Sequence, residues 1–304
     1  MRKHFSNYIE HASETHDDLI FITGDLGYNA LENLSSKLGN RFINAGVAEQ
    51  GMMSMAAGMA SQGYRVICYS IAPFVVYRCL EQIRNDVCFH NLPVTIVGNG
   101  GGYGYGIMGS SHHAIEDIAC LSGLPNMTCY VPAFLEDMTI CLNELFHKRK
   151  PSYLRLGLGK NMPTGMLLND FGAGKVAETQ QAGLTIIAQG PVVNNVFAAL
   201  AINEYKENVD VFVVNKMPIV SLAIEIVNSI NKTQKVLIVE EHISIGGLGA
   251  AISILIHELS LNVKQFKSLR AEGYPGALYG SQAYHQQLSG LDEKNISNVI
   301  NSYF

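Results

Sequence analysis

Short apolar runs alternate with longer stretches of helical periodicity along this chain, and this alternation restricts its possible folds more than any other feature. Apolar runs without a polar face predict strands buried on both sides, and intervening helices let successive strands run parallel. We therefore expect an α/β fold in which helices cover both faces of a parallel sheet. In the first half, the predicted strands are 19–25, 65–70, 92–100, 127–133 and 152–157, and the predicted helices are 28–38, 49–62, 73–89, 113–122 and 134–147.

The pattern restarts after the segment GKNMPTGMLLNDFGAGK, which contains proline and several glycines. Such a break predicts a domain boundary, which we place near residue 172, giving domains over 1–172 and 173–304. The chain has 304 residues, which is enough for two such domains. In the second half, the predicted strands are 184–190, 209–215 and 235–242, and the predicted helices are 192–205, 217–230 and 247–259.

Charge and composition argue against several classes of partner and location. Only 15% of the residues are charged, the net charge is −5 and no lysine- or arginine-rich run occurs, so nucleic acid and anionic membranes are not expected as partners. No apolar run approaches the ~20 residues that span a bilayer, and the amphipathic start lacks the core of a signal peptide. The six cysteines form no CxxC pair, which favours reduced thiols. We expect a cytoplasmic protein.

Glu49 stands where a predicted strand or turn meets a helix rich in methionine, alanine and glycine. A carboxylate beside so much apolar surface costs free energy unless it is paired or is kept there for its proton. At a helix N-terminus a carboxylate can also be no more than a favourable dipole interaction of about 0.3–1 kcal/mol. Taken alone, the position of Glu49 leaves both interpretations open.

Two further segments follow predicted strands. Phe74, Tyr77 and Arg78 are spaced three and four residues apart at the start of a helix, where aromatic residues often belong to the core. The glycine-rich segment 98–109 leads into Ser111, His112 and His113, and it is neither a dinucleotide fingerprint nor a Walker loop. It could be a plain surface loop, but loops after the carboxyl ends of parallel strands are where α/β proteins bind ligands.

Taken in order, five segments resemble the pyrimidine-binding and C-terminal domains of the transketolase family of thiamine diphosphate enzymes. The resemblance covers nearly the whole chain, and it implies two three-layer domains, each with a parallel sheet. The segments are GVAEQGM, IAPFVVYRCLEQIRNDV, SSHHAIEDIACLSGLPNMTCYVPA, YLRLG and VLIVEEHISIGGLGAAI.

The resemblance implies a role for each candidate residue at the cofactor. The glutamate matching Glu49 hydrogen-bonds N1′ of the aminopyrimidine, which prepares the cofactor for its carbanion chemistry. Phe74 matches the aromatic residue on which the aminopyrimidine stacks, a contact worth about 0.5–1.5 kcal/mol beyond burial. Tyr77 matches a second aromatic residue of that pocket, and Asp25 is placed near the thiazolium ring.

The resemblance also implies contacts with the substrate. His112 matches the histidine that contacts the ketose hydroxyls and assists proton transfer. Arg155 matches an arginine that commonly binds a substrate phosphate. The expected catalytic residues are therefore Glu49 and His112, and the expected substrate-binding residues are His112 and Arg155.

A partner subunit follows from the same resemblance. Single-chain members carry an N-terminal pyrophosphate-binding domain whose Gly-Asp-Gly…Asn motif binds Mg²⁺, and this motif does not occur in the sequence. We therefore expect a β-type subunit of a two-component enzyme, with the Mg²⁺ ligands on a separate N-terminal subunit and no metal site here. The expected assembly is α₂β₂, and the chain is expected to self-associate as a dimer.

Two positions depart from the family pattern. Met108 stands where transketolases have an acidic residue that recognises a donor hydroxyl, and Gly100 stands where a histidine contacts the substrate phosphate. Each lost hydrogen bond to a charged group costs about 1–3 kcal/mol. We expect ketol transfer on a sugar or sugar-like substrate that differs from the ordinary ones, and whether it is phosphorylated stays open.

Four other functions fit part of the sequence. The β subunit of a 2-oxo acid dehydrogenase E1 component shares the size and the Glu49 helix, and it would need a lipoyl protein instead of an aldose. A deoxyxylulose-phosphate synthase relative suits the segment VAEQ. A non-catalytic scaffold would not need Glu49, Phe74 and His112 together, and a dinucleotide-binding oxidoreductase lacks its fingerprint. His242 fits a structural or interface role better than a catalytic one.

Overall fold

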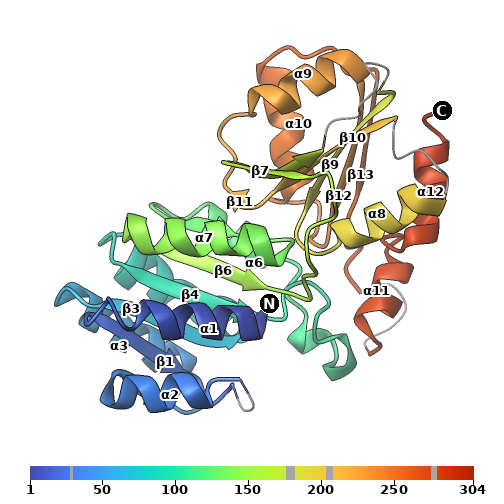
Figure 1. Cartoon of the computed structure of the whole chain (residues 1–304). Coiled ribbons are helices and arrows are strands. Elements are labelled where there is room, and N and C mark those ends of the chain that lie inside the picture. The colour runs from blue at the N-terminus through green and yellow to red at the C-terminus, as the bar shows by residue number, and fades with distance from the viewer. Residues whose placement is uncertain (28–29, 176–181, 203–207, 275–278) are drawn as a thin grey trace.

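The computed structural model describes residues 1–27, 30–175, 182–202, 208–274 and 279–304. Two sheets, each covered by helices on both faces, make up this part of the chain (Figure 1). Apart from its edge strand β11 (Lys216–Met217), the first sheet belongs to the blue and green half of the chain, and the second belongs to the yellow and red half. The predicted α/β class with two three-layer units is confirmed, although each sheet includes antiparallel strands.

The first sheet has seven strands in the order β11-β5-β6-β4-β3-β1-β2, and all neighbours are parallel except β11 with β5. Its central strands are apolar and buried along nearly their whole length, as predicted from their composition. The strands are β1 (Leu19–Thr23), β2 (Phe42–Asn44), β3 (Arg65–Ile71), β4 (Val94–Asn99), β5 (Thr128–Tyr130), β6 (Ser152–Leu156) and β11 (Lys216–Met217).

Two apolar cores hold the helices of this domain against the sheet. One face packs against α1 (Arg2–Ala12), α2 (Glu32–Leu38) and α7 (Leu135–Lys148). The other face packs against α3 (Glu49–Ser61), α4 (Ala72–Tyr77), α5 (Leu80–Gln82), the π-helix Ile83–Cys88 and α6 (Asp117–Ser122).

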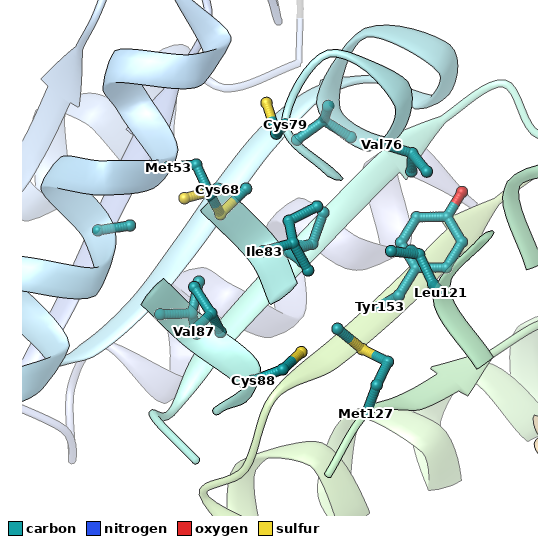
Figure 2. Close-up of a cluster of buried hydrophobic side chains, with 14 of the residues drawn as sticks. Met53, Cys68, Val76, Cys79, Ile83, Val87, Cys88, Leu121, Met127 and Tyr153 are labelled. Atoms are coloured by element: carbon teal, nitrogen blue, oxygen red, sulfur yellow. The ribbon is translucent and has the colours of Figure 1, made fainter. Parts of the chain in front are cut away.

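The second of these cores contains several cysteine thiols (Figure 2). Cys68 on β3, Cys79 after α4 and Cys88 of the π-helix all lie among buried aliphatic side chains. Burial raises the pKa of Cys79 and of Cys88 to about 12. All six cysteines are free thiols, as predicted.

The second sheet has six strands in the order β13-β12-β9-β10-β8-β7. β13, β12, β9 and β10 are parallel, whereas β8 and β7 add an antiparallel edge. One face packs against α8 and α12, and the other packs against α9 and α10. The strands are β7 (Leu167–Asn169), β8 (Gly172–Lys175), β9 (Leu184–Gln189), β10 (Val209–Val214), β12 (Lys235–Glu240) and β13 (Gln265–Leu269), and the helices are α8 (Val193–Ile202), α9 (Ile224–Thr233), α10 (Leu248–Glu258), α11 (Gln282–Leu288) and α12 (Glu293–Asn301).

All eight predicted strands are present, but two predicted helices differ from the structure. The helix predicted over 217–230 begins only at Ile224, and its first predicted residue, Met217, instead pairs with β5 of the first sheet. The helix predicted over 113–122 begins at Asp117, because Ala114 bridges to Gly102 instead.

The other predicted helices agree with the structure more closely. The run predicted over 73–89 is divided into α4, α5 and the π-helix. The first two residues of the predicted helix 28–38 and the last three of the helix 192–205 lie outside the described residues. The boundary near residue 172 lies between β7 and β8 and stays a prediction.

Candidate cofactor and substrate site

Glu49 is the first residue of α3, and its side chain is only 3% exposed. Its two carboxylate oxygens have different partners. Arg78 donates from Nη1 to Oε2 at 3.0 Å, and the Ser70 hydroxyl donates to Oε1 at 3.4 Å. Gly24, at the end of β1, lies close by, since a Cβ built there would lie 3.7 Å from Cγ of Glu49. The carboxylate is therefore held at the carboxyl ends of β1 and β3, where ligands bind in α/β folds.

Phe74 and His112 are connected to this carboxylate through Arg78. Phe74 is half-buried on α4, and the Arg78 guanidinium that bonds Glu49 lies over its ring, with 4.3 Å between Cζ and the ring centroid. The His112 ring meets Phe74 edge-on at a centroid distance of 4.9 Å. The structure thus brings together three residues that are far apart in the sequence and that were predicted to share a site.

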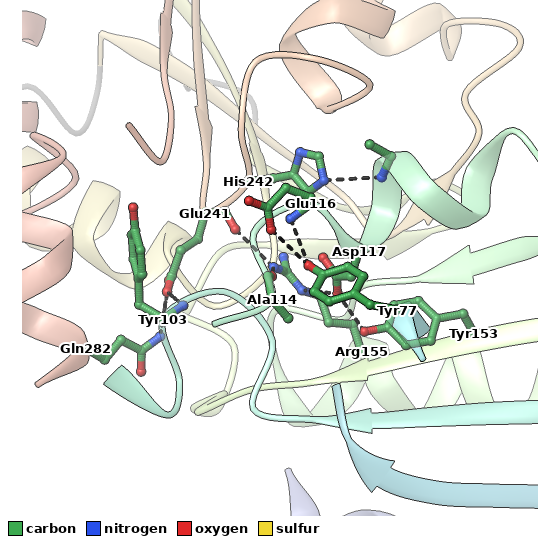
Figure 3. Close-up of polar contacts among 11 residues, drawn as sticks. Tyr77, Tyr103, Ala114, Glu116, Asp117, Tyr153, Arg155, Glu241, His242 and Gln282 are labelled. Atoms are coloured by element: carbon green, nitrogen blue, oxygen red, sulfur yellow. Dashed lines mark hydrogen bonds and ion pairs between the residues drawn. The ribbon is translucent and has the colours of Figure 1, made fainter. Parts of the chain in front are cut away.

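Tyr77 lies one turn along the helix from Phe74 but points to a different neighbour (Figure 3). Its hydroxyl donates to Oε2 of Glu116 at 2.9 Å and accepts from the Glu116 N–H at 3.3 Å. Burial raises the pKa of Tyr77, so the hydroxyl remains a donor. These contacts anchor the segment that follows His112, and the predicted place of Tyr77 in the cofactor pocket stays a prediction.

Asp25 follows β1 with a left-handed backbone, at φ 59°. The Asn44 amide at the end of β2 donates to Oδ1 of Asp25 at 2.9 Å, and the Asp25 N–H donates to Oδ1 of Asn44 at 3.1 Å. This exchange fixes the loop at the carboxyl end of the sheet. The contact between Asp25 and the thiazolium ring stays a prediction.

Arg155 on β6 is 7% exposed and lies in a polar cluster between the two domains (Figure 3). Its Nε lies 3.0 Å from Oδ2 of Asp117, which is fully buried, and its Nη2 donates to the carbonyls of Ala114 and Glu241. The guanidinium therefore already meets three internal acceptors. The phosphate contact predicted for Arg155 stays a prediction, and these contacts favour a role in holding the domains together.

Glu241, directly after β12, connects the two domains, and sequence reasoning missed it. Its carboxylate accepts from the Tyr103 N–H at 2.6 Å and from the amides of Gln282 and Gln286 on α11. Gly102 makes this approach possible, because it has φ 66° and a Cβ there would lie 2.5 Å from Oε1 of Glu241. The glycines of segment 98–109 thus serve a close contact between the domains.

A cavity of about 620 Å³ opens at the carboxyl ends of β4 and β6. Asn99 and Gly100 line it, together with Tyr105, whose hydroxyl accepts a hydrogen bond from the Asn99 amide. Charged side chains of both signs line the same cavity: the basic Arg2 and Lys3 at the start of α1, and the acidic Glu10 and Glu32. Sequence reasoning missed Arg2 and Lys3 because nothing in an N-terminal helix indicates which sheet edge it reaches.

His242 is fully buried at the end of β12. Its Nε2 accepts from the Ala119 N–H at 3.2 Å, and its Nδ1 lies 2.8 Å from the Ile243 carbonyl, to which it can donate. Burial lowers the pKa of His242, which favours this neutral form. The geometry supports the structural role expected for this residue.

Comparison with known proteins matches both halves of the chain to one family. The family described as "Transketolase, pyrimidine binding domain" matches residues 1–160, and the family described as "Transketolase, C-terminal domain" matches residues 172–296. The chain belongs to the transketolase family. The predicted family is therefore confirmed, as are its pyrimidine-binding and C-terminal parts, and thiamine diphosphate is the cofactor that this family implies.

Individual relatives agree with the family. An apulose-4-phosphate transketolase subunit from Actinobacillus succinogenes is 30% identical over 267 residues, covering 86% of this chain and 84% of the relative. A 1-deoxy-D-xylulose-5-phosphate synthase from Clostridium perfringens is 28% identical over 278 residues, but this chain spans only 44% of its length. A solved split-gene transketolase, described as an inactive β4 tetramer, superposes with a TM-score of 0.79 at 24% identity, covering 99% of this chain and 97% of that one.

These relatives test two predictions, the class of enzyme and its division into separate subunits. The prediction of a transketolase-like transferase is confirmed, and the relative that is itself a transketolase subunit is consistent with an enzyme made of separate chains. Within the described residues, no helix is long and apolar enough to cross a membrane.

Proposed function

We propose that this chain is the β subunit of a two-component transketolase, which transfers a two-carbon ketol unit between sugars or sugar-like substrates. The observation that carries the proposal is the buried Glu49 carboxylate at the start of α3, which Arg78 connects to the half-buried ring of Phe74, the ring that His112 contacts. Arg78, one of the two partners of this carboxylate, is half exposed, and the carboxylate lies at the carboxyl ends of β1 and β3, where ligands bind in α/β folds; both features favour a ligand role.

The residues present fit the aminopyrimidine end of thiamine diphosphate. Glu49 offers a carboxylate for a ring nitrogen and Phe74 offers a flat aromatic face. When bound, the cofactor supplies the carbanion chemistry of the family. Glu49 would orient it and share a proton with it, and His112 would bind the hydroxyls of the substrate and move a proton there.

We further propose that a separate N-terminal subunit supplies the Mg²⁺ ligands for the cofactor diphosphate. Two copies of each subunit would form the α₂β₂ assembly, with the β subunits also in contact as a dimer. The relative that is named as one subunit of a transketolase supports this arrangement. The free thiols support a cytoplasmic location.

The substrate is proposed to occupy the cavity that Arg2, Lys3 and Asn99 line. Arg2 and Lys3 suit a phosphate group, as in the name of the apulose-4-phosphate relative, and the acidic Glu10 and Glu32 line the same cavity. Gly100 supplies no side chain to this cavity and Met108 is 53% exposed, so polar groups elsewhere would have to recognise the hydroxyls. We therefore expect a sugar substrate that differs from those of ordinary transketolases.

Calorimetric titration of thiamine diphosphate with Mg²⁺ tests the proposal, first with this chain alone and then with its candidate N-terminal partner. We expect binding in the mixture, and we expect Glu49→Gln to abolish it. Glu81→Gln is the matched control, because Glu81 is an exposed carboxylate of the same domain. Absence of binding in the mixture would refute the cofactor assignment for this pair, and tight binding to the chain alone would refute the need for a partner.

A further inference from the structure

Arg78 contacts both groups that are assigned above to the aminopyrimidine. Its Nη1 donates to Oε2 of Glu49 at 3.0 Å, and its Cζ lies 4.3 Å from the centroid of the Phe74 ring. Arg78 is one helical turn beyond Phe74, so its side chain reaches back over that ring. One side chain therefore forms an ion pair with the carboxylate and a cation–π contact with the aromatic ring.

The guanidinium resembles an aminopyrimidine in shape and in hydrogen bonding. It is flat and delocalised, it donates N–H groups in its own plane and it stacks on aromatic faces. An aminopyrimidine that shares a proton with a carboxylate is also flat, donates in its plane and stacks. The same oxygen of Glu49 and the same face of Phe74 cannot serve both groups at once.

We propose that Arg78 occupies the aminopyrimidine position in the cofactor-free subunit and swings out when thiamine diphosphate binds. This inference rests on the proposed function. Arg78 is suited to leave, because its side chain is 49% exposed whereas that of Glu49 is 3% exposed. The Ser70 hydroxyl stays within reach of the other carboxylate oxygen during the exchange.

This placement also explains how the empty subunit tolerates a buried carboxylate. A buried carboxylate needs polar partners, and Arg78 adds one to the Ser70 hydroxyl and the N-terminus of α3 before any cofactor arrives. The site is then preformed, with Glu49 and Phe74 already side by side. Arg78 acts as a competitor of the cofactor, and its release forms part of the binding equilibrium.

The test compares cofactor affinity across variants of the complex with the N-terminal partner. Arg78→Gln and Arg78→Lys are titrated with thiamine diphosphate and Mg²⁺ by calorimetry. Arg84→Gln is the matched control, because the Arg84 guanidinium also lies over a ring, 4.5 Å from the Phe89 centroid, but bonds Asn85 instead of Glu49. We expect Arg78→Gln to bind about tenfold tighter than the unmodified complex, Arg78→Lys to lie between them and Arg84→Gln to show no change.

The outcomes separate this inference from the proposed function. Equal affinity of the unmodified complex and Arg78→Gln would overturn the exchange and leave the cofactor assignment standing. Weaker binding by Arg78→Gln would also overturn it, since Arg78 would then belong to the cofactor site. If neither the unmodified complex nor the Arg78→Gln complex binds the cofactor, the proposed function itself is overturned. The thermal unfolding of each variant confirms that it is folded.

Discussion

Two arginine–carboxylate pairs in this chain have similar lengths but different surroundings. Glu49 pairs with Arg78 at 3.0 Å, and Asp117 pairs with Arg155 at 3.0 Å. Arg78 is 49% exposed, whereas Arg155 is 7% exposed and also reaches two backbone carbonyls. An ion pair that solvent can reach can exchange partners, whereas one enclosed by the protein fixes its neighbours in place.

The difference follows from where each pair lies. The Arg78 pair is at the open carboxyl edge of the first sheet, on the turn after α4. The Arg155 pair is covered by the second domain, through the carbonyl of Glu241 at the end of β12. The first pair is therefore suited to binding a ligand. The second is suited to fixing the position of the two domains relative to each other.

The largest effect is expected from Arg155→Met. The substitution leaves Asp117 fully buried without its cation, so the free energy of unfolding should fall by about 3–5 kcal/mol. Urea denaturation measures it. Arg65→Met is the matched control: Arg65 is equally buried, but its acidic neighbour Asp18 is 30% exposed and also pairs with Arg149, so a smaller loss is expected. Equal losses in the two variants would contradict the distinction drawn here.

A pH effect is expected from Glu240, a buried carboxylate that accepts hydrogen bonds from the backbone N–H groups of Leu248 and Gly249. Burial raises the pKa of Glu240 to about 7, although these two N–H bonds act to lower it. A raised pKa means that the folded state holds the proton more tightly. This contribution to stability is complete below about pH 4.5 and is lost as the pH rises through about 7.

Glu240→Gln should remove this pH dependence. Between about pH 4.5 and 7 the free energy of unfolding of the unmodified chain should fall by up to ~1.4 kcal/mol per pH unit relative to the variant, and above that range the difference should stay constant. Urea denaturation of both proteins at several pH values measures the difference. Parallel stability curves would show that Glu240 keeps an ordinary proton affinity in the fold.

A smaller loss is expected from Gly102→Ala. The new Cβ would lie 2.5 Å from Oε1 of Glu241, at a residue with φ 66°. The positive φ alone costs an L-residue about 1–2 kcal/mol, and the contact adds to it. Gly273→Ala separates the two causes, because Gly273 has φ 76° but, among the described residues, no atom within 4 Å of a Cβ. If both variants lose the same free energy of unfolding, the contact with Glu241 carries no cost.

The smallest effect on stability is expected from Arg78→Gln. We expect a loss of about 0.5–1 kcal/mol, because a half-exposed ion pair contributes little and Glu49 keeps both Ser70 and the helix N-terminus. Thermal or urea unfolding of the free chain measures it. A loss as large as that of Arg155→Met would mean that the Arg78 pair is structural and does not exchange.

Much of the fold could be predicted because a buried parallel strand can be recognised from the composition of a few neighbouring residues. Each of the eight predicted strands consists mainly of apolar residues that the sheet buries on both faces. β13 was missed because it is an exposed edge strand of mixed composition, QFKSL. β11 was missed because its two residues become a strand only by pairing with β5, which is distant in the sequence.

The sequence by itself determined the alternation of strands and helices and the family, and it indicated Glu49, Phe74 and His112 as candidate residues that the fold brings near one another. It could do so because periodicity and ordered motifs are carried by neighbouring residues. Only the tertiary structure decided that Arg155 is enclosed between the domains, that Tyr77 bonds Glu116 and that Arg78 lies over Phe74. Burial and pairing depend on segments that meet only after folding. The desolvation that these segments cause sets the pKa of a charged side chain and the partners it needs.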